Sequence, residues 1–266
     1  MALRLSLARP VPIIATLAAG TLGVAVCSRM MSGTASAESN APQKVFKGGF
    51  AAVKLPLLNS KDESPDTKRL RFKLPQETAI TGLPLSYEPG YMELLVKKYP
   101  NGRGSGYLHS LKPGDKLFIL TTLSEYKWKP NSYPHISLIA GGCGITPMFQ
   151  LAQGILRNPE DKTRMTLVFG VNTDDDVLLR KELDDFAREF PDRFQVKYTV
   201  SKPKEGSELR RGRIDRELLE EVLPKGTQDT KVFVCGPPGM EDALVGKRGE
   251  GVLGQLGFTM NQIHKF

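Results

Sequence analysis

The chain has 266 residues, 40% of them hydrophobic and 25% charged, which is an ordinary globular composition that can bury a sizeable core in one or two domains. Its three cysteines, Cys27, Cys143 and Cys235, lie about a hundred residues apart and favour neither a disulfide framework nor a zinc site. The net charge of +8 favours an acidic partner or a phosphorylated ligand; nucleic acid is not predicted, because the basic residues are scattered and no nucleic-acid motif accompanies them.

The first forty residues combine basic side chains with an uncharged apolar run. Arg4, Arg9 and Arg29 precede any acidic residue, and residues 11–27 carry no charge, which is at the lower limit of a membrane-spanning length. A secretory signal peptide is the alternative, but the run is long for one, and the Ser/Ala-rich residues 32–39 resemble a mitochondrial presequence. We therefore expect residues 1–45 to hold a targeting segment, one transmembrane helix and a linker.

Residues 46–130 are expected to be mostly β. Short apolar runs within residues 49–74 flank the polar stretch NSKDESPDT, which predicts a hairpin or meander with a turn at residues 59–67. Two further strands are expected at residues 91–99 and 112–120.

From residue 131 onward, strands and helices alternate. The predicted order is strand 136–140, helix 146–157, strand 165–171, helix 177–190, strand 195–200, helix 216–223 and strand 231–235. Such alternation predicts a parallel sheet covered by helices, and hence an α/β domain over residues 131–266.

The stretch ISLIAGGCGITPMF, residues 136–149, is typical of a buried strand, a glycine turn and a helix. Glycines let a ligand approach the backbone, and the first-turn N–H groups of the helix favour an anion such as a pyrophosphate. Pro147 suits that turn because the N–H it lacks has no partner within the helix. The same pattern also occurs in tight strand-to-helix turns that bind nothing.

A second strand ends in KVFVCGPPGM, residues 231–240. The prolines stop the strand and leave Cys235 at its carboxyl end, where open parallel sheets bind their ligands. Cys235 is equally well explained as a small buried apolar residue.

Together, LIAGGCGITPM, VFVCGPPGM and the terminal Phe266 resemble the ferredoxin reductase-like flavoproteins, and within them the NADH-cytochrome b5 reductases, over roughly residues 48–266. LLVKKYPNG, HISLIAGG, NPEDKT and CGPPGM are similar to the fungal mitochondrial members. The resemblance implies an α+β two-domain protein, with an antiparallel flavin-binding β-barrel at residues 46–130 before the α/β domain.

The same resemblance implies an activity. NADH would give a hydride to FAD, and single electrons would then pass to cytochrome b5 or a similar acidic haem protein. It also implies a mitochondrial outer-membrane anchor, with the catalytic part in the cytosol or the intermembrane space.

The resemblance further implies the site residues. Gly142, Cys143, Gly144, Thr146 and Pro147 match the loop between the NADH pyrophosphate and the flavin, although Cys143 stands where threonine is usual. Cys235, Gly236 and Pro237 match the segment that places a catalytic cysteine against the nicotinamide, and Phe266 matches the usual terminal aromatic residue. On the flavin side, the matching residues are Lys97, Tyr99, Gly102, Arg103, Gly104 and Ser105. Without the resemblance, Lys97 is more simply part of a solvated face.

The chain also departs from the family pattern. The flavin motif Arg-x-Tyr-Ser/Thr is absent; it would lie between Leu85 and Gly90, where only LSYEP stands, so about thirty residues are missing. Leu120-Thr121-Thr122 replaces the usual Lys-Gly-Pro. We therefore expect an incomplete barrel, because a barrel that loses strands exposes unpaired backbone groups. The alternative is a flavin-deficient paralogue or defective gene product that keeps only pyridine-nucleotide binding.

A last departure concerns the choice of nucleotide. The family commonly has an aspartate directly after the strand at residues 195–200, where this chain has Ser201, followed by Lys202 and Lys204. We expect weaker discrimination against NADPH, unless the lysines simply face water or Asp174 to Asp176 restore the repulsion.

Overall fold

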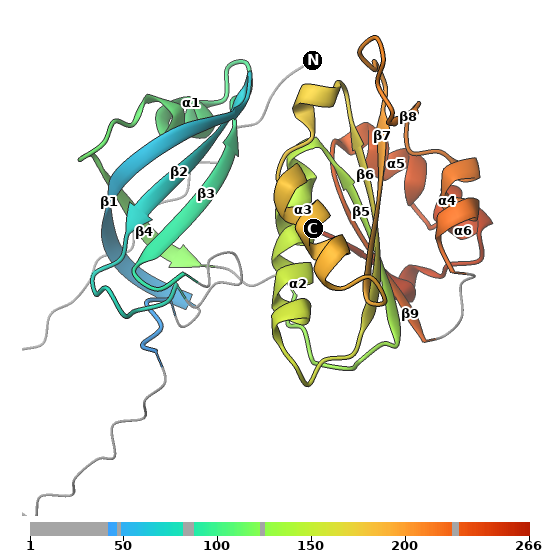
Figure 1. Cartoon of the computed structure of the whole chain (residues 1–266), viewed down its shortest axis with the longest axis horizontal. Coiled ribbons are helices and arrows are strands. Elements are labelled where there is room, and N and C mark those ends of the chain that lie inside the picture. The colour runs from blue at the N-terminus through green and yellow to red at the C-terminus, as the bar shows by residue number, and fades with distance from the viewer. Residues whose placement is uncertain (1–41, 47–48, 82–87, 123–125, 225–228) are drawn as a thin grey trace, which may run out of the picture. The chain divides into compact units, whose positions relative to one another are not determined.

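The structure is a computed structural model and describes residues 42–46, 49–81, 88–122, 126–224 and 229–266 (Figure 1). The predicted anchor, residues 11–27, lies outside these ranges. Within them, no helix combines the length and apolar character needed to cross a bilayer. The domain boundaries near residues 45 and 130 stay predictions.

The N-terminal half of the described chain is built on a curled antiparallel sheet. Its strands are β1 (Gly49–Ser64), β2 (Thr67–Lys73), β3 (Tyr91–Lys97) and β4 (Lys116–Thr122), in the order β3-β2-β1-β4. The long β1 pairs with β4 through its first half and with β2 through its second half. A short helix, α1 (Arg103–Ser110), follows β3.

The hairpin between β1 and β2 is confirmed, but its predicted turn at residues 59–67 is too long. Strand pairing continues to Ser64 opposite Thr67, and only Pro65 and Asp66 form the turn. Opposite charges explain why such a polar stretch stays extended: Asp62 lies across from Lys68, and Glu63 forms an ion pair with the next residue of β2, Arg69, at 2.7 Å.

This sheet is an incomplete barrel, as expected. Within the described residues, β3 and β4 each pair with a single strand and so form its two edges. Its core contains Leu55, Leu57, Leu70 and Phe72, all fully buried. On the edge strand β4, by contrast, Phe118 and Leu120 are about half exposed, at 49% and 50%.

The C-terminal half is a parallel α/β sheet. The strands are β5 (His135–Gly141), β6 (Arg164–Val171), β7 (Phe194–Val200), β8 (Arg210–Arg211), β9 (Thr230–Cys235) and β10 (Ile263–Lys265), in the order β10-β9-β5-β6-β7-β8. Every pairing is parallel. The sequence did not predict β8 and β10, because two or three residues are too few to show a period.

Helices cover both faces of the parallel sheet (Figure 1). They are α2 (Ile145–Arg157), α3 (Arg180–Glu189), α4 (Arg216–Val222), α5 (Pro238–Leu244) and α6 (Val252–Gln255). Alternate residues of β5 point to opposite layers: Leu138 packs in the cluster with α2 and α3, and Ile139 in the cluster with α4, α5 and α6. The helix predicted from residue 177 begins later, since Leu179 adopts a left-handed conformation with φ of 57°.

The strand order places a switch point at the centre of this sheet. From β5 the chain proceeds through β6 to β8 on one side, then returns to the other side of β5 as β9 and β10. The loops after β5 and β9 therefore diverge from adjacent strand ends, where doubly wound sheets open a ligand crevice.

Candidate active site

The two predicted loops meet at the carboxyl ends of β5 and β9. After β5, Gly142 has φ of 52° and Gly144 lies against the neighbouring loop. A Cβ atom at residue 144 would lie 2.1 Å from the carbonyl oxygen of Cys235, so only glycine allows this approach. The predicted strand, glycine turn and helix are confirmed.

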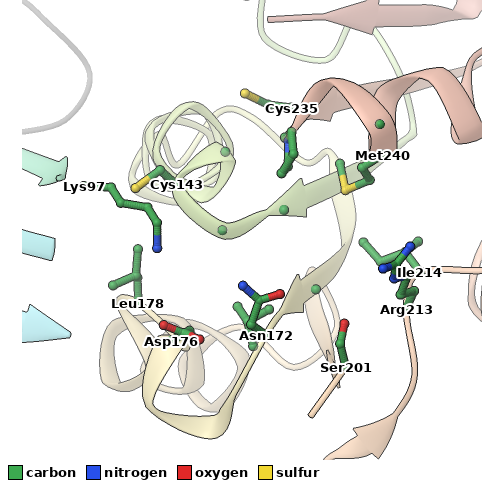
Figure 2. A pocket seen from close by; sticks show the side chains of 18 of the residues that line it. Lys97, Cys143, Asn172, Asp176, Leu178, Ser201, Arg213, Ile214, Cys235 and Met240 are labelled. Atoms are coloured by element: carbon green, nitrogen blue, oxygen red, sulfur yellow. The ribbon is translucent and has the colours of Figure 1, made fainter. Parts of the chain in front are cut away.

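A cavity of about 840 Å³ lies over these loops (Figure 2). It brings together residues predicted from both halves of the chain: Lys97, Tyr99, Gly142, Cys143, Gly144, Cys235, Gly236 and Pro237. Their roles toward a ligand stay predictions.

Lys97 forms the rim of the cavity on the side of the antiparallel sheet. Its Nζ makes an ion pair with Asp66 of the hairpin turn, at 2.5 Å, so it is not simply a solvated lysine. Burial would lower the pKa of Lys97, but the hydrogen bond and charge of Asp66 outweigh it and the pKa is raised. Beside it, Thr67 is buried, while Tyr99 remains 55% exposed.

Both cysteines of the described chain line the cavity, and neither is in a disulfide. Burial raises the pKa of the Cys143 thiol, which therefore stays protonated at neutral pH. In Figure 2, Cys143 lies beside Lys97, and Cys235 lies at the start of the segment leading into α5.

Thr146, Pro147 and Phe266 support the site from outside the cavity lining. Thr146 Oγ1 donates to the carbonyl of Cys143 at 3.1 Å, which holds the glycine turn, and Pro147 lies in the first turn of α2. Phe266 stacks on Phe233 with ring centroids 5.9 Å apart, and its N–H donates to a carbonyl of β9.

Gly102, Arg103, Gly104 and Ser105 form the beginning of α1, away from this cavity lining. Ser105 Oγ accepts a hydrogen bond from the N–H of Tyr99, at 3.2 Å. No side chain caps the helix, and a Cβ at Gly104 would meet nothing within 4 Å. The first-turn N–H groups are therefore accessible to an anion, which fits the diphosphate of FAD.

Sequence reasoning missed several lining residues. Asn172 follows β6, and Arg213 and Ile214 follow β8. The rule that ligands lie at the carboxyl ends of parallel strands could have found Asn172. Arg213 follows a strand of only two residues, which leaves no signal in the sequence.

The structure separates Ser201 from the two lysines that follow it. Ser201 lines it, but Lys202 and Lys204 do not. Lys204 Nζ instead forms an ion pair with Asp175 at 2.7 Å.

The fold and the site define a class: an oxidoreductase with FAD-binding and NAD-binding domains. Residues 85–128 match the oxidoreductase FAD-binding domain, and residues 138–245 match the oxidoreductase NAD-binding domain. The cytochrome b5 reductase domain of Ulva prolifera nitrate reductase superposes with a TM-score of 0.73 at 27% identity, covering 85% of this chain and 100% of that domain.

Two curated relatives place the chain more narrowly within these oxidoreductases. NADH-cytochrome b5 reductase 2 of Emericella nidulans is 40% identical over 96% of this chain and 90% of its own length. The Aspergillus fumigatus protein of the same name is 39% identical over 94% and 89%. The chain belongs to the NADH-cytochrome b5 reductase family.

The alignment with the Emericella nidulans protein is relevant to the segment that is missing from the FAD-binding domain. It runs over 292 positions, more than the 266 residues of this chain, so at least 26 residues of the Emericella nidulans protein have no counterpart here.

Proposed function

We propose that this protein passes electrons from NADH, through FAD, to cytochrome b5 at the mitochondrial outer membrane. The membership of the family supports NADH-dependent oxidoreduction, and the names of the relatives point to cytochrome b5 as acceptor. The observation that carries the proposal is the cavity in which Cys235 and the glycine turn meet Lys97 and Tyr99.

The residues of the chain have distinct tasks in this function. FAD, when bound, takes up two electrons from NADH and releases them singly. The first turn of α1 would hold its diphosphate, and Thr67, Lys97 and Tyr99, which line the cavity, would contact its flavin. Cys235 would orient the nicotinamide, and the close packing at Gly144 fixes the Cys235 backbone relative to the glycine turn after β5.

A second candidate function rests on the altered flavin domain. The sequence lacks Arg-x-Tyr-Ser/Thr, and the described residues form a four-stranded sheet with two edges. A paralogue with this defect would bind pyridine nucleotide without retaining flavin.

Flavin content and acceptor reduction separate the two candidates. The full chain, purified in detergent, is denatured to release its flavin, which is quantified per chain; the native protein is then mixed with NADH and cytochrome b5. Stoichiometric FAD and rapid reduction of cytochrome b5 support the reductase. NADH binding with neither flavin nor reduction supports the flavin-deficient candidate.

The membrane location rests on residues 11–27 and needs its own test. The full chain and a variant carrying Leu17→Arg and Leu22→Arg are expressed in a fungal host, and mitochondria are extracted at alkaline pH. Each arginine costs about 2.5–3.5 kcal/mol at the centre of a membrane helix, so the variant should leave the membrane while the parent remains. Extraction of both proteins contradicts the anchor.

A further inference from the structure

The cavity extends well beyond the cysteines. Its lining passes from the ends of β9 and β5 to residues that follow β6, β7 and β8. Four strand spacings of about 4.8 Å separate β9 from β8, or about 19 Å, which is of the order of an extended dinucleotide. A dinucleotide with its nicotinamide at Cys235 therefore has its adenosine near the ends of β7 and β8.

A hydroxyl and a guanidinium meet at that far end. Ser201 follows β7, Arg213 follows β8, and both line the cavity. They come from adjacent backbone segments, since the N–H of Gly212 donates to the carbonyl of Val200 at 2.9 Å. Figure 2 shows both side chains at the end of the cavity opposite Lys97 and Cys143.

Arg213 differs from its neighbour Arg210 in having no acidic partner in the described part of the chain. Arg210 forms ion pairs with Asp215 and Glu217 at 3.2 and 3.7 Å. Around Arg213, the described residues supply no carboxylate within ion-pair distance. Its guanidinium therefore remains available to an anionic ligand.

The backbone that carries Arg213 is held in place. Thr199 is fully buried, and its Oγ1 lies 3.1 and 2.9 Å from the carbonyl oxygens of Arg210 and Gly212. Ile214 packs onto Gly170 and presents an apolar side chain to the cavity, where an adenine ring could lie. The segment is thus ordered before a ligand arrives.

Negative charge is scarce in this part of the cavity. Asp176 is the only carboxylate among the described lining residues, and it accepts hydrogen bonds from the N–H and Oγ1 of Thr173, at 2.9 and 2.8 Å. Asp174 and Asp175 in the same loop are engaged by Ser207 and Lys204. Of these three acids, only Asp176 lines the cavity.

We propose that Arg213 and Ser201 form a subsite for the 2′-phosphate of an adenosine, so that the protein accepts 2′-phosphorylated pyridine dinucleotides as well as NADH. A guanidinium pairs with phosphate oxygens in a fork, and a serine hydroxyl donates to a third. The inference rests on the proposed function, since it assigns the adenosine end of the same cavity.

Binding of adenosine fragments tests the subsite without requiring flavin or turnover. Calorimetry compares 2′,5′-ADP with 5′-ADP on the full chain, on Arg213→Ala, on Ser201→Asp and on Arg211→Ala. The last variant is a matched control, because it removes the same charge from an exposed residue two positions away that does not line the cavity.

The wild type should bind 2′,5′-ADP at least as tightly as 5′-ADP. Arg213→Ala should weaken 2′,5′-ADP binding about tenfold to a hundredfold, as expected for a charged hydrogen bond, and change 5′-ADP binding little. Ser201→Asp should also disfavour 2′,5′-ADP, whereas Arg211→Ala should behave as wild type.

Several results would overturn the subsite: a wild type that prefers 5′-ADP tenfold or more, equal losses for both ligands in Arg213→Ala, equal effects of Arg211→Ala, or no binding of either ligand. The reductase function is judged separately, by flavin content and reduction of cytochrome b5. The two proposals can therefore fail independently.

Discussion

At the scale of single residues, the proposed role of Cys235 beside the nicotinamide follows from its position on the cavity wall at the end of β9. We expect Cys235→Ser to keep the fold and the bound FAD but to slow flavin reduction by NADH about tenfold to a hundredfold, since a small displacement of the nicotinamide has effects of that size. Stopped-flow absorbance measures the rate. Cys27→Ser, in the predicted anchor, is the control; equal rates in wild type and Cys235→Ser would remove Cys235 from the reaction.

Asp161 is a residue whose contribution should depend on pH. It is fully buried and accepts hydrogen bonds from Trp128 Nε1 and from the N–H groups of Asn131 and Thr163, at 2.7, 3.3 and 3.1 Å. Burial would raise the pKa of this carboxyl, but the hydrogen bonds from Trp128 and Thr163 outweigh it and the pKa is lowered.

A lowered pKa in the folded state stabilises the protein above the unfolded pKa, about 3.9, and this contribution is lost as the pH falls through the folded pKa. We expect Asp161→Asn to reduce the free energy of unfolding by about 2 kcal/mol at pH 7 and by much less in acid. Urea unfolding, followed by the fluorescence of the only tryptophan, measures this. The control Asp192→Asn changes an exposed carboxylate and should leave the free energy of unfolding unchanged. Equal losses for Asp161→Asn at pH 7 and in acid would contradict the lowered pKa of Asp161.

At the scale of elements, the sequence predicted what depends on local pattern. The apolar run of β5, its glycine turn and α2 appear within a residue of their expected bounds, because a buried parallel strand and an amphipathic helix each have a clear period. The sequence did not predict α1, β8, β10, α5 and α6, which are short and held by tertiary contacts. The predicted hairpin turn was too long because cross-strand charges keep a polar segment extended.

The residues of the candidate site also divide into those that a local motif predicts and those that tertiary contacts position. Gly144 and Cys235 could be predicted because they lie in motifs, whereas Arg213 could not, since its position depends on the pairing of β8 with β7. The lysines after Ser201 have the same limit, because the sequence left open whether they reach a ligand or face water. Lys204 is near Ser201 in the sequence but bonded to Asp175 in the structure.

The contact between the two loops can be tested through Gly144. Gly144→Ala would place a Cβ 2.1 Å from the carbonyl oxygen of Cys235, and that backbone atom cannot move cheaply. We expect a loss of about 1–3 kcal/mol in the free energy of unfolding, measured in urea, together with weaker NADH binding. Gly106→Ala in α1 is the control, since its Cβ meets nothing within 4 Å and alanine favours a helix. Unchanged stability of Gly144→Ala would contradict this packing.

At the scale of the whole molecule, the net charge of +8 bears on the acceptor. Association with an acidic haem protein is accelerated by long-range attraction, which salt screens. We expect kcat/KM for cytochrome b5 to fall about tenfold between low and physiological ionic strength, measured at saturating NADH. Reduction of a neutral quinone should be nearly unchanged. A rate for cytochrome b5 that is insensitive to salt, or rises with it, would contradict an acidic partner.

The shared strand β1 has a consequence for the order in which the antiparallel sheet assembles. Its second half meets β2 across a two-residue turn, whereas its first half pairs with β4, with Gly49 opposite Thr122. Closing so long a loop is entropically costlier and slower than forming a local hairpin. During refolding, amide protons in the hairpin should become protected from exchange before those shared by β1 and β4, so the edge bearing Phe118 would be the last part of this sheet to form.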